Sequence, residues 1–211
     1  MFYSIYNMSY SQLNQDIRVI DFYKDKQNGF FIEIGASDGI YLSNTFLLET
    51  KYNWTGICVE PIPEIYSTMI LNRPKSKCFD NAVYSTSNII VNFDIAINNE
   101  VLSGISENID CYKNIIDANK TTIQVKTISL TDLLDVNKAP RFIEYLSLDT
   151  EGSEYEILKT FDFDKYIFGL IDVEHNFIEP RRTQIRKLLL SKGYIYICEN
   201  KWDDSYKHSS L

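Results

Sequence analysis

The chain has 211 residues and a formal net charge of −8, a length for which one domain with a substantial core is expected. Its composition, 45% hydrophobic and 24% charged, is that of an ordinary globular protein, which excludes disorder, collagen and coiled coil. The acidic balance argues against nucleic acid as a partner, because phosphate neutralisation needs clustered Lys and Arg.

The sequence gives no sign of a membrane segment or of an oxidising compartment. It contains no run of 18 apolar residues, and its N-terminus lacks the basic and apolar regions of a secretory signal. The four cysteines show no zinc-site spacing, and we interpret them as free thiols of a reducing compartment. We therefore predict a cytoplasmic protein without a membrane span.

Apolar runs of strand length alternate with amphipathic segments of helix length, which is typical of a parallel sheet covered by helices. In chain order, the first half is predicted to form a helix over 11–24, a strand over 30–35, a helix over 44–51, a strand over 55–60, a helix that opens at Pro61 or Pro63 and ends before Pro74, and a strand over 77–80.

The alternation breaks after residue 80 and later resumes. Residues 88–97 and 123–128 are β-rich and bracket a polar stretch over 103–120, which predicts an inserted edge hairpin with a loop or helix between its strands. The second half then predicts a strand over 142–149, a helix over 154–161, a strand over 168–174, a helix over 180–192 and a strand over 194–199. The prediction is one doubly wound α/β domain over 1–211, with helices on both faces of a mostly parallel sheet and a loose polar tail over 201–211.

The first strand leads into a glycine loop, Gly35 to Gly39, that suits a cationic ligand. It is not GxGxxG, and Glu33 and Asp38 place acid where a diphosphate would be repelled. S-adenosylmethionine carries a sulfonium and an ammonium and no phosphate, so it fits this loop better than a dinucleotide. The alternative is an ordinary strand–helix turn with a solvated Asp38.

The ends of the next two strands carry candidate nucleoside contacts. Glu60 follows the second strand, where an acid can accept both ribose hydroxyls, although it can equally cap the next helix. Asp80 or Asn81, after the third strand, is a weak candidate for the adenine amino group.

The fourth and fifth strands end in further polar groups. Asp149, Glu151 and Glu154 lie within six residues, an arrangement that is costly unless the acids face a cation or a metal. The fifth strand ends in Glu174 and His175. Neighbouring strand residues point to opposite faces, so both cannot face the same ligand unless the strand has already ended.

These segments together resemble the FkbM-type S-adenosylmethionine-dependent methyltransferases. The resemblance rests on FIEIGASDG, YLSNTFLLE, WTGICVEPIPEIY, the downstream NRP, NAVYS, the LSG at 102–104, YLSLDTEGSEYEIL and DVEHNF, which occur in the family's order over roughly residues 28–200. It implies the class I methyltransferase fold. That fold usually finishes with a β-hairpin, so either 201–208 forms the last strand or the sheet is one strand short.

The resemblance also implies a set of cofactor contacts. It assigns the methionine end of the cofactor to Glu33, Gly35, Asp38 and Gly39, its carboxylate to Ser43, Asn44 or Thr45, the ribose to Glu60, the adenine to Asp80 or Asn81, and the sulfonium or acceptor to Asp149. The neighbouring residues included in this cofactor site are Ala36, Pro61 and Ala82.

The predicted function is O-methyl transfer to a hydroxyl of a carbohydrate or other small molecule, that is, a glycan-modifying or related activity. His175 is the predicted general base, with Asp149 and Glu151 beside it in the catalytic site, because an imidazole accepts a proton at neutral pH. The rival is a divalent metal on Asp149, Glu151 and Glu174. The alternative function is an inactive cofactor-binding or interaction module with the same fold. A nicotinamide oxidoreductase is disfavoured by the missing GxGxxG. The sequence leaves open whether the protein forms a homodimer.

Overall fold

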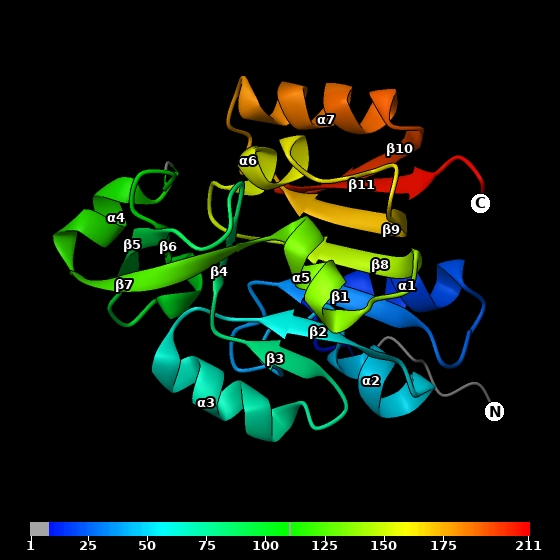
Figure 1. Ribbon diagram of the computed structural model, residues 1–211, viewed down its shortest axis with the longest axis horizontal. Helices are drawn as coiled ribbons and strands as arrows, with labels where there is room; N and C mark the ends of the chain where they lie inside the picture. The colour runs from blue at the N-terminus through cyan, green and yellow to red at the C-terminus, as the bar shows by residue number, and fades with distance from the viewer. Residues whose placement is uncertain (1–8, 110) are drawn as a thin grey trace.

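The computed structural model of the protein describes residues 9–109 and 111–211, so part of the N-terminal stretch tested for a secretory signal lies outside the described residues. A seven-stranded main sheet runs through the molecule (Figure 1). Its strands, in spatial order, are β10 (Tyr194–Asn200), β11 (Asp203–His208), β9 (Ile167–Glu174), β8 (Phe142–Leu148), β1 (Phe30–Ile34), β2 (Thr55–Val59) and β3 (Lys77–Phe79). Strands β9, β8, β1, β2 and β3 are parallel, as predicted.

Helices cover both faces of this sheet, and the alternation of side chains along each strand explains why. In β1, Ile32 packs against the core shared with α5, α6 and α7, whereas Phe31 packs on the opposite side against α1, α2 and α3. The helices of the first face are α5 (Leu130–Asn137), α6 (Glu154–Lys159) and α7 (Arg181–Ser191), and those of the second are α1 (Gln15–Phe22), α2 (Phe46–Tyr52) and α3 (Pro63–Asn72). The predicted doubly wound α/β architecture is confirmed. Helix α5 was not predicted.

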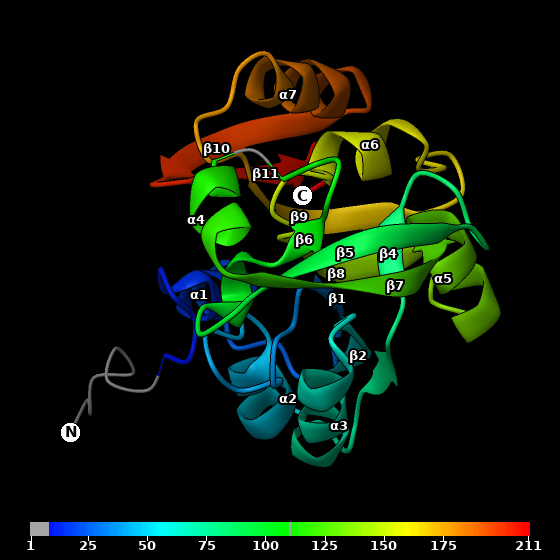
Figure 2. The ribbon, with the colours of Figure 1, turned by 90° about the vertical axis from the view of Figure 1, so that its left-hand side faces the viewer.

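The predicted inserted strands are present, but the prediction that they lie at an edge of the main sheet is wrong. They form a second sheet in the order β4 (Ala82–Tyr84), β7 (Lys120–Ser129), β5 (Ile90–Ala96) and β6 (Gly104–Ile105). The reason is that β4 leaves β3 and pairs in parallel with the end of β7, while β5 pairs antiparallel along the rest of β7. The polar stretch between them holds the short helices η2 (Glu100–Leu102) and α4 (Lys113–Ala118). Figure 2 shows this second sheet in front of the end of the main sheet.

The prediction of a loose tail over 201–211 is also wrong. Strand β11 lies between β9 and β10 and is antiparallel to both, which completes the terminal hairpin that the resemblance implied. Its central Tyr206 is fully buried. Polar residues of this strand are buried through hydrogen bonds rather than apolar contacts, so its composition resembles that of a surface tail.

None of the helices in residues 9–109 and 111–211 is long and apolar enough to cross a membrane.

Candidate functional site

A cavity lies at the carboxyl ends of β1, β2, β8 and β9, the edge at which open parallel sheets bind ligands. The second sheet and η2 contribute Phe93, Leu102 and Ile105 to its wall. Eight acidic residues line the cavity, namely Glu33, Glu60, Glu100, Asp149, Glu151, Asp172, Glu174 and Asp203. Among the described lining residues there is no Lys, Arg or His. The cavity therefore favours a cationic ligand.

The glycine loop follows β1 and passes very close to β8. Gly35 has a φ of +81°, and a Cβ on it would lie 2.1 Å from the backbone carbonyl oxygen of Asp149, so no other residue fits there without strain. Asp38 does not line the cavity. Its Oδ1 accepts hydrogen bonds from the backbone N–H of Ile40 at 2.8 Å and of Tyr41 at 2.7 Å, and so it fixes the shape of the loop.

Glu33 is the centre of a buried hydrogen-bond network that holds the SNT segment in place. Its carboxylate accepts from the hydroxyls of Ser43 and Thr45 and from the Arg73 guanidinium at 3.1 Å. Ser43 and Thr45 are buried away from the cavity, so this placement does not fit a contact with the cofactor carboxylate. Arg73 belongs to the NRP segment, which sequence analysis noted without giving it a role.

Asn44 is the member of the SNT segment that lines the cavity. Its Nδ2 donates to Ser147 Oγ at 2.8 Å, whereas its Oδ1 is buried without a hydrogen-bond partner. An unpartnered amide oxygen in a ligand cavity is suited to accept a hydrogen bond from a ligand ammonium.

Glu60 lies in the cavity wall at the end of β2, where the sequence placed it. The carboxylate is 6% exposed, and its Oε1 accepts from the backbone N–H of Ile62 at 2.9 Å. Burial raises the pKa of Glu60 to about 7, against the opposing effect of hydrogen bonds from the backbone of Ile62 and Ser37.

The predicted adenine contacts do not reach the cavity through their polar groups. Asp80 is exposed, and the Asn81 amide donates to the backbone carbonyl of Lys126 at 3.1 Å. The cavity wall beside Glu60 is apolar instead, with Ile62 and Val83 lining it. This apolar wall was not predicted, because only polar residues at strand ends were considered as candidate ligand contacts. Val83 belongs to β4, a strand that was not predicted from the sequence.

Asp149, Glu151 and Glu174 converge at the carboxyl ends of β8 and β9. One carboxylate oxygen from each lies within 4.8 Å of the others. Burial, followed by the charge of Asp203, raises the pKa of Asp149 to about 8. Burial and the charge of Asp149 raise the pKa of Glu174 well above its ordinary value. Asp149 and Glu174 therefore resist carrying two negative charges side by side without a cation.

Residues from the two ends of the described chain, Gln12, Gln15, Trp202 and Asp203, form one part of the cavity lining, which we call the mouth because Gln12 is exposed and Trp202 is half-buried. Gln15 of α1 donates through Nε2 to Asp203 Oδ2 at 2.8 Å, and Trp202 donates through Nε1 to Gln12 Oε1 at 3.2 Å. All four residues line the cavity. Burial raises the pKa of Asp203 to about 6. Sequence analysis gave this region no role because it treated the last residues as a tail.

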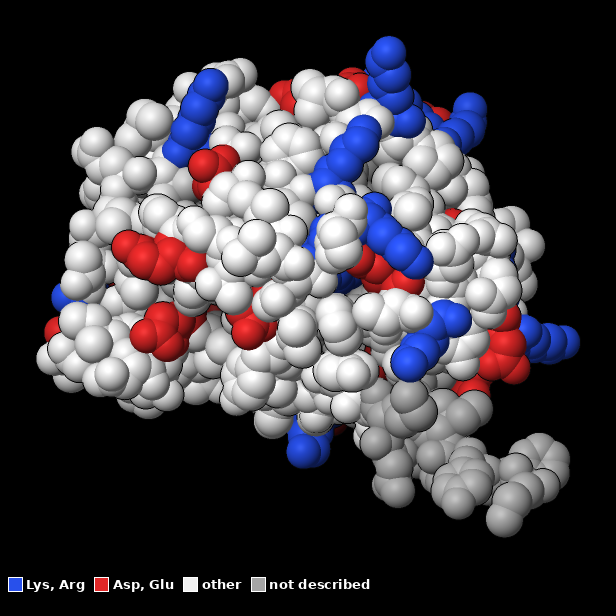
Figure 3. All heavy atoms as spheres, turned by 90° about the horizontal axis from the view of Figure 1, so that it is seen from below, with Lys and Arg blue, Asp and Glu red and all other residues white. Residues whose placement is uncertain are grey.

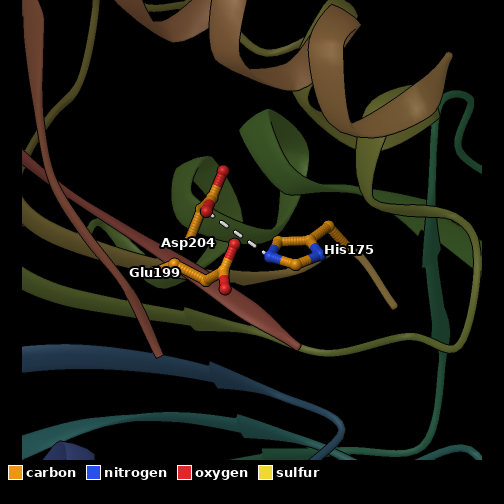
Figure 4. Close-up of side chains that lie close together, drawn as sticks. All are labelled: His175, Glu199 and Asp204. Carbon is orange, nitrogen blue, oxygen red and sulfur yellow. Dashed lines mark ion pairs between the residues drawn. The ribbon is translucent and has the colours of Figure 1, made fainter. Parts of the chain in front are cut away.

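The structure places His175, the predicted base, outside the cavity. Its Nδ1 accepts from the backbone N–H of Phe177 at 3.0 Å, and its Nε2 lies 3.4 Å from Asp204 Oδ1 (Figure 4). Strand β9 runs on to Glu174, so alternation turns Glu174 into the cavity and His175 towards α7. His175 is 1% exposed and belongs to the packing between α7 and β11. Its predicted role as base does not fit this position.

The sequence profile of the methyltransferase FkbM domain matches residues 33–196. No curated protein matches the chain. Similar solved structures include the METTL16 MTase domain, with a TM-score of 0.51 and 10% identity over 94% of this chain and 67% of that chain. Others are the N-terminal domain of human METTL16 in complex with SAH (TM-score 0.46, 13% identity, 93% and 69% covered) and precorrin-6y C5,15-methyltransferase from Geobacter metallireducens GS-15 (TM-score 0.46, 11% identity, 90% and 84% covered).

The profile spans most of the chain, so the chain belongs to the methyltransferase FkbM domain family and is an S-adenosylmethionine-dependent methyltransferase. The cavity fits this cofactor, since it combines acids, an apolar wall and the unpartnered Asn44 oxygen and has no described basic residue in its lining.

Proposed function

We propose that this methyltransferase transfers a methyl group to a hydroxyl of a carbohydrate or another small polyol. The observation that carries the proposal is the polar mouth of the cavity, where Gln12, Gln15, Trp202 and Asp203 lie together. Amide and carboxylate groups exchange hydrogen bonds with hydroxyls, and an indole offers an apolar face to a sugar ring.

The inner part of the cavity supplies the cofactor contacts. Glu60 would accept hydrogen bonds from the ribose hydroxyls, and Ile62 and Val83 would contact the adenine. Asn44 Oδ1 and the acidic lining of the cavity would stabilise the ammonium and the sulfonium. When bound, the cofactor provides an electrophilic methyl group.

Transfer requires alignment and removal of one proton. A bond forms between the acceptor oxygen and the methyl carbon while the carbon–sulfur bond breaks, with its electron pair left on sulfur, and the hydroxyl proton must leave. Holding the acceptor in line contributes about 7–11 kcal/mol in well-oriented reactions. The titratable groups placed to act on the hydroxyl are the cavity carboxylates Asp149, Glu174 and Asp203 rather than His175.

The surface supports a small acceptor rather than nucleic acid. On the face seen in Figure 3, most Lys and Arg side chains lie on the right-hand half of the view with acidic side chains between some of them, and further acidic side chains lie on the left, so this face carries charges of both signs. The basic residues Arg182 and Arg186 of α7 are engaged with Asp204. Electrostatic capture of a phosphate backbone needs a basic track. We also include a cytoplasmic location in the proposal, because Cys58, Cys78 and Cys198 carry free thiols.

The test is a radiolabelled methyl-transfer assay on a panel of sugars and sugar alcohols, each paired with the analogue that lacks one hydroxyl. We expect product from at least one polyol, loss of product with one deoxy analogue, and a methyl ether in the mass spectrum. Methylation of an amine or of RNA would refute the acceptor class. Tight SAH binding without turnover on any acceptor would favour the inactive binding module instead.

A further inference from the structure

We propose that Asp149, Glu151 and Glu174 form a binding site for one hard divalent cation of the Mg²⁺ or Mn²⁺ class. The inference deepens the proposed function, because the site lies in the wall of the same cavity. Its ligands are carboxylate oxygens, the type that these cations prefer.

The geometry matches a single coordination sphere. One oxygen from each of the three carboxylates lies within 4.8 Å of the other two. Oxygens bound to one hard divalent cation lie at most twice the metal–oxygen distance apart, which is about 4.2 Å for Mg²⁺ and about 4.6–5.2 Å for a larger cation, so the three carboxylates are within reach of one ion after at most a small side-chain adjustment. The strands deliver these groups from two positions, with Asp149 and Glu151 following β8 and Glu174 ending β9.

A second observation indicates that the site is built for a ligand. Glu174 is 4% exposed, yet its Oε2 has no hydrogen-bond partner in the described structure. Ser153, which also lines the cavity, is fully buried with an unpartnered Oγ. Buried polar atoms are nearly always satisfied, so orphaned oxygens in one cavity wall point to a missing partner.

The surroundings of the three acids within the cavity are acidic. Glu151 accepts a hydrogen bond from Asn176 Nδ2 at 3.3 Å, which helps to orient its carboxylate. Asp203, cross-strand neighbour of Glu174, adds another acid. The described cavity lining offers no Lys, Arg or His to balance them. A divalent cation would supply the balance.

A second acidic group in the molecule shows the contrast. His175, Glu199 and Asp204 satisfy the same distance criterion (Figure 4). There, however, Arg182 pairs with both carboxylates, and Arg186 pairs with Asp204 at 2.7 Å. These guanidinium groups already neutralise the two carboxylates, so we assign the cation to the cavity.

In the proposed transfer, the cation held by Asp149, Glu151 and Glu174 would coordinate the acceptor hydroxyl and lower its pKa, and Asp203, the cavity carboxylate outside the metal site, would accept the proton as the carbon–oxygen bond forms. This accounts for hydroxyl activation in a cavity whose described lining contains no histidine.

The experiment is a titration of the purified full chain with Mn²⁺, followed by electron paramagnetic resonance, with Mg²⁺ as competitor. We expect about one Mn²⁺ per chain, at least tenfold weaker binding in Glu174→Gln and Asp149→Asn, and unchanged binding in the matched control Glu199→Gln. Thermal melting checks folding. Mn²⁺ should raise the melting temperature of the wild type but not of Glu174→Gln, whose metal-free melting temperature should not fall, because the change removes like-charge crowding.

Absence of Mn²⁺ binding, binding that survives both cavity substitutions, or binding lost in Glu199→Gln would overturn the site. If Glu174→Gln does not fold, Asp149→Asn decides. SAH calorimetry in EDTA separates this inference from the proposed function. Cofactor binding without Mn²⁺ binding defeats the metal site alone, whereas Mn²⁺ binding through Glu174 without hydroxyl methylation defeats the acceptor proposal alone.

Discussion

Replacement of Arg73 by Met should be among the most destabilising single changes in this protein. The guanidinium is 1% exposed and lies between Glu33 and Glu49, each of which is 2% exposed. It donates five hydrogen bonds, to Glu33, Glu49, the Gly39 carbonyl, Ser43 and Thr45. Met keeps much of the volume of the side chain but leaves two carboxylates buried without their cation.

The expected loss is about 3–5 kcal/mol in the free energy of unfolding, the usual result of removing one partner from a buried ion pair. The total free energy of unfolding of a native domain is about 5–15 kcal/mol, so this loss would be a large share of it. Arg73→Lys should lose less, since the charge remains but one ammonium cannot reproduce the fork of contacts. The assay is urea denaturation followed by circular dichroism.

A double-variant cycle identifies the cause. If uncompensated charge dominates, Glu33→Gln should cost less in the Arg73→Met background than in the wild type, with a coupling of about 1 kcal/mol or more. SAH affinity should fall in Arg73→Met, because the network positions the SNT segment beside the cavity. A loss of stability below about 1 kcal/mol, or strict additivity with Glu33→Gln, would refute the reasoning.

Glu60→Ala should weaken SAH binding by roughly 2–3 kcal/mol in calorimetry, as expected for lost hydrogen bonds to a charged group, and undiminished binding would remove Glu60 from the site. Because burial raises the pKa of Glu60 to about 7, the protonated carboxyl stabilises the fold below its ordinary pKa, and this stabilisation is lost as pH rises through about 7. In melting experiments across this pH range, Glu60→Gln should reduce the fall in melting temperature, and a pH profile identical to that of the wild type would contradict the assignment. His175→Gln should lower stability by about 1–3 kcal/mol while turnover changes less than the roughly 10²-fold expected for a base, which a kinetic comparison with melting data can decide. Gly35→Ala should lose more than about 1 kcal/mol of stability and reduce SAH affinity, because the φ of Gly35 is +81° and the added Cβ would lie 2.1 Å from the backbone carbonyl oxygen of Asp149. A variant as stable as the wild type in urea denaturation would show that the loop can rearrange to accept a side chain.

The sequence predicted the parts of the fold that depend on apolar periodicity. The five parallel strands and most helices were found because Ile32 and its counterparts alternate with residues of the other face. Strand β11 was missed because Asp203, Asp204 and Ser205 are buried by hydrogen bonds and ion pairs, which leave no apolar pattern.

For the site, the strand-end rule placed Glu60, Asp149 and Glu174 in one cavity. It could not show which polar residues serve the scaffold. Ser43 and Thr45 donate to Glu33, which is buried beside Arg73, and the sequence does not show that Arg73 lies next to this network. The choice between Glu174 and His175 depended on where β9 ends, a boundary that periodicity does not fix to one residue.

The position of β11 has a consequence for how the molecule assembles. In chain order β10 precedes β11, yet in space β11 separates β10 from β9. The edge of β9 therefore stays unpaired until residues 203–208 have been synthesised and inserted, and such an open edge is a template for pairing with another chain. The same insertion brings Asp203 to Gln15, across 188 positions of sequence, so the mouth of the cavity is completed late. A ligand that binds at this mouth should therefore stabilise the sheet with β11 inserted relative to folding intermediates that lack this strand. The acceptor region of the enzyme is complete only after β11 has been inserted.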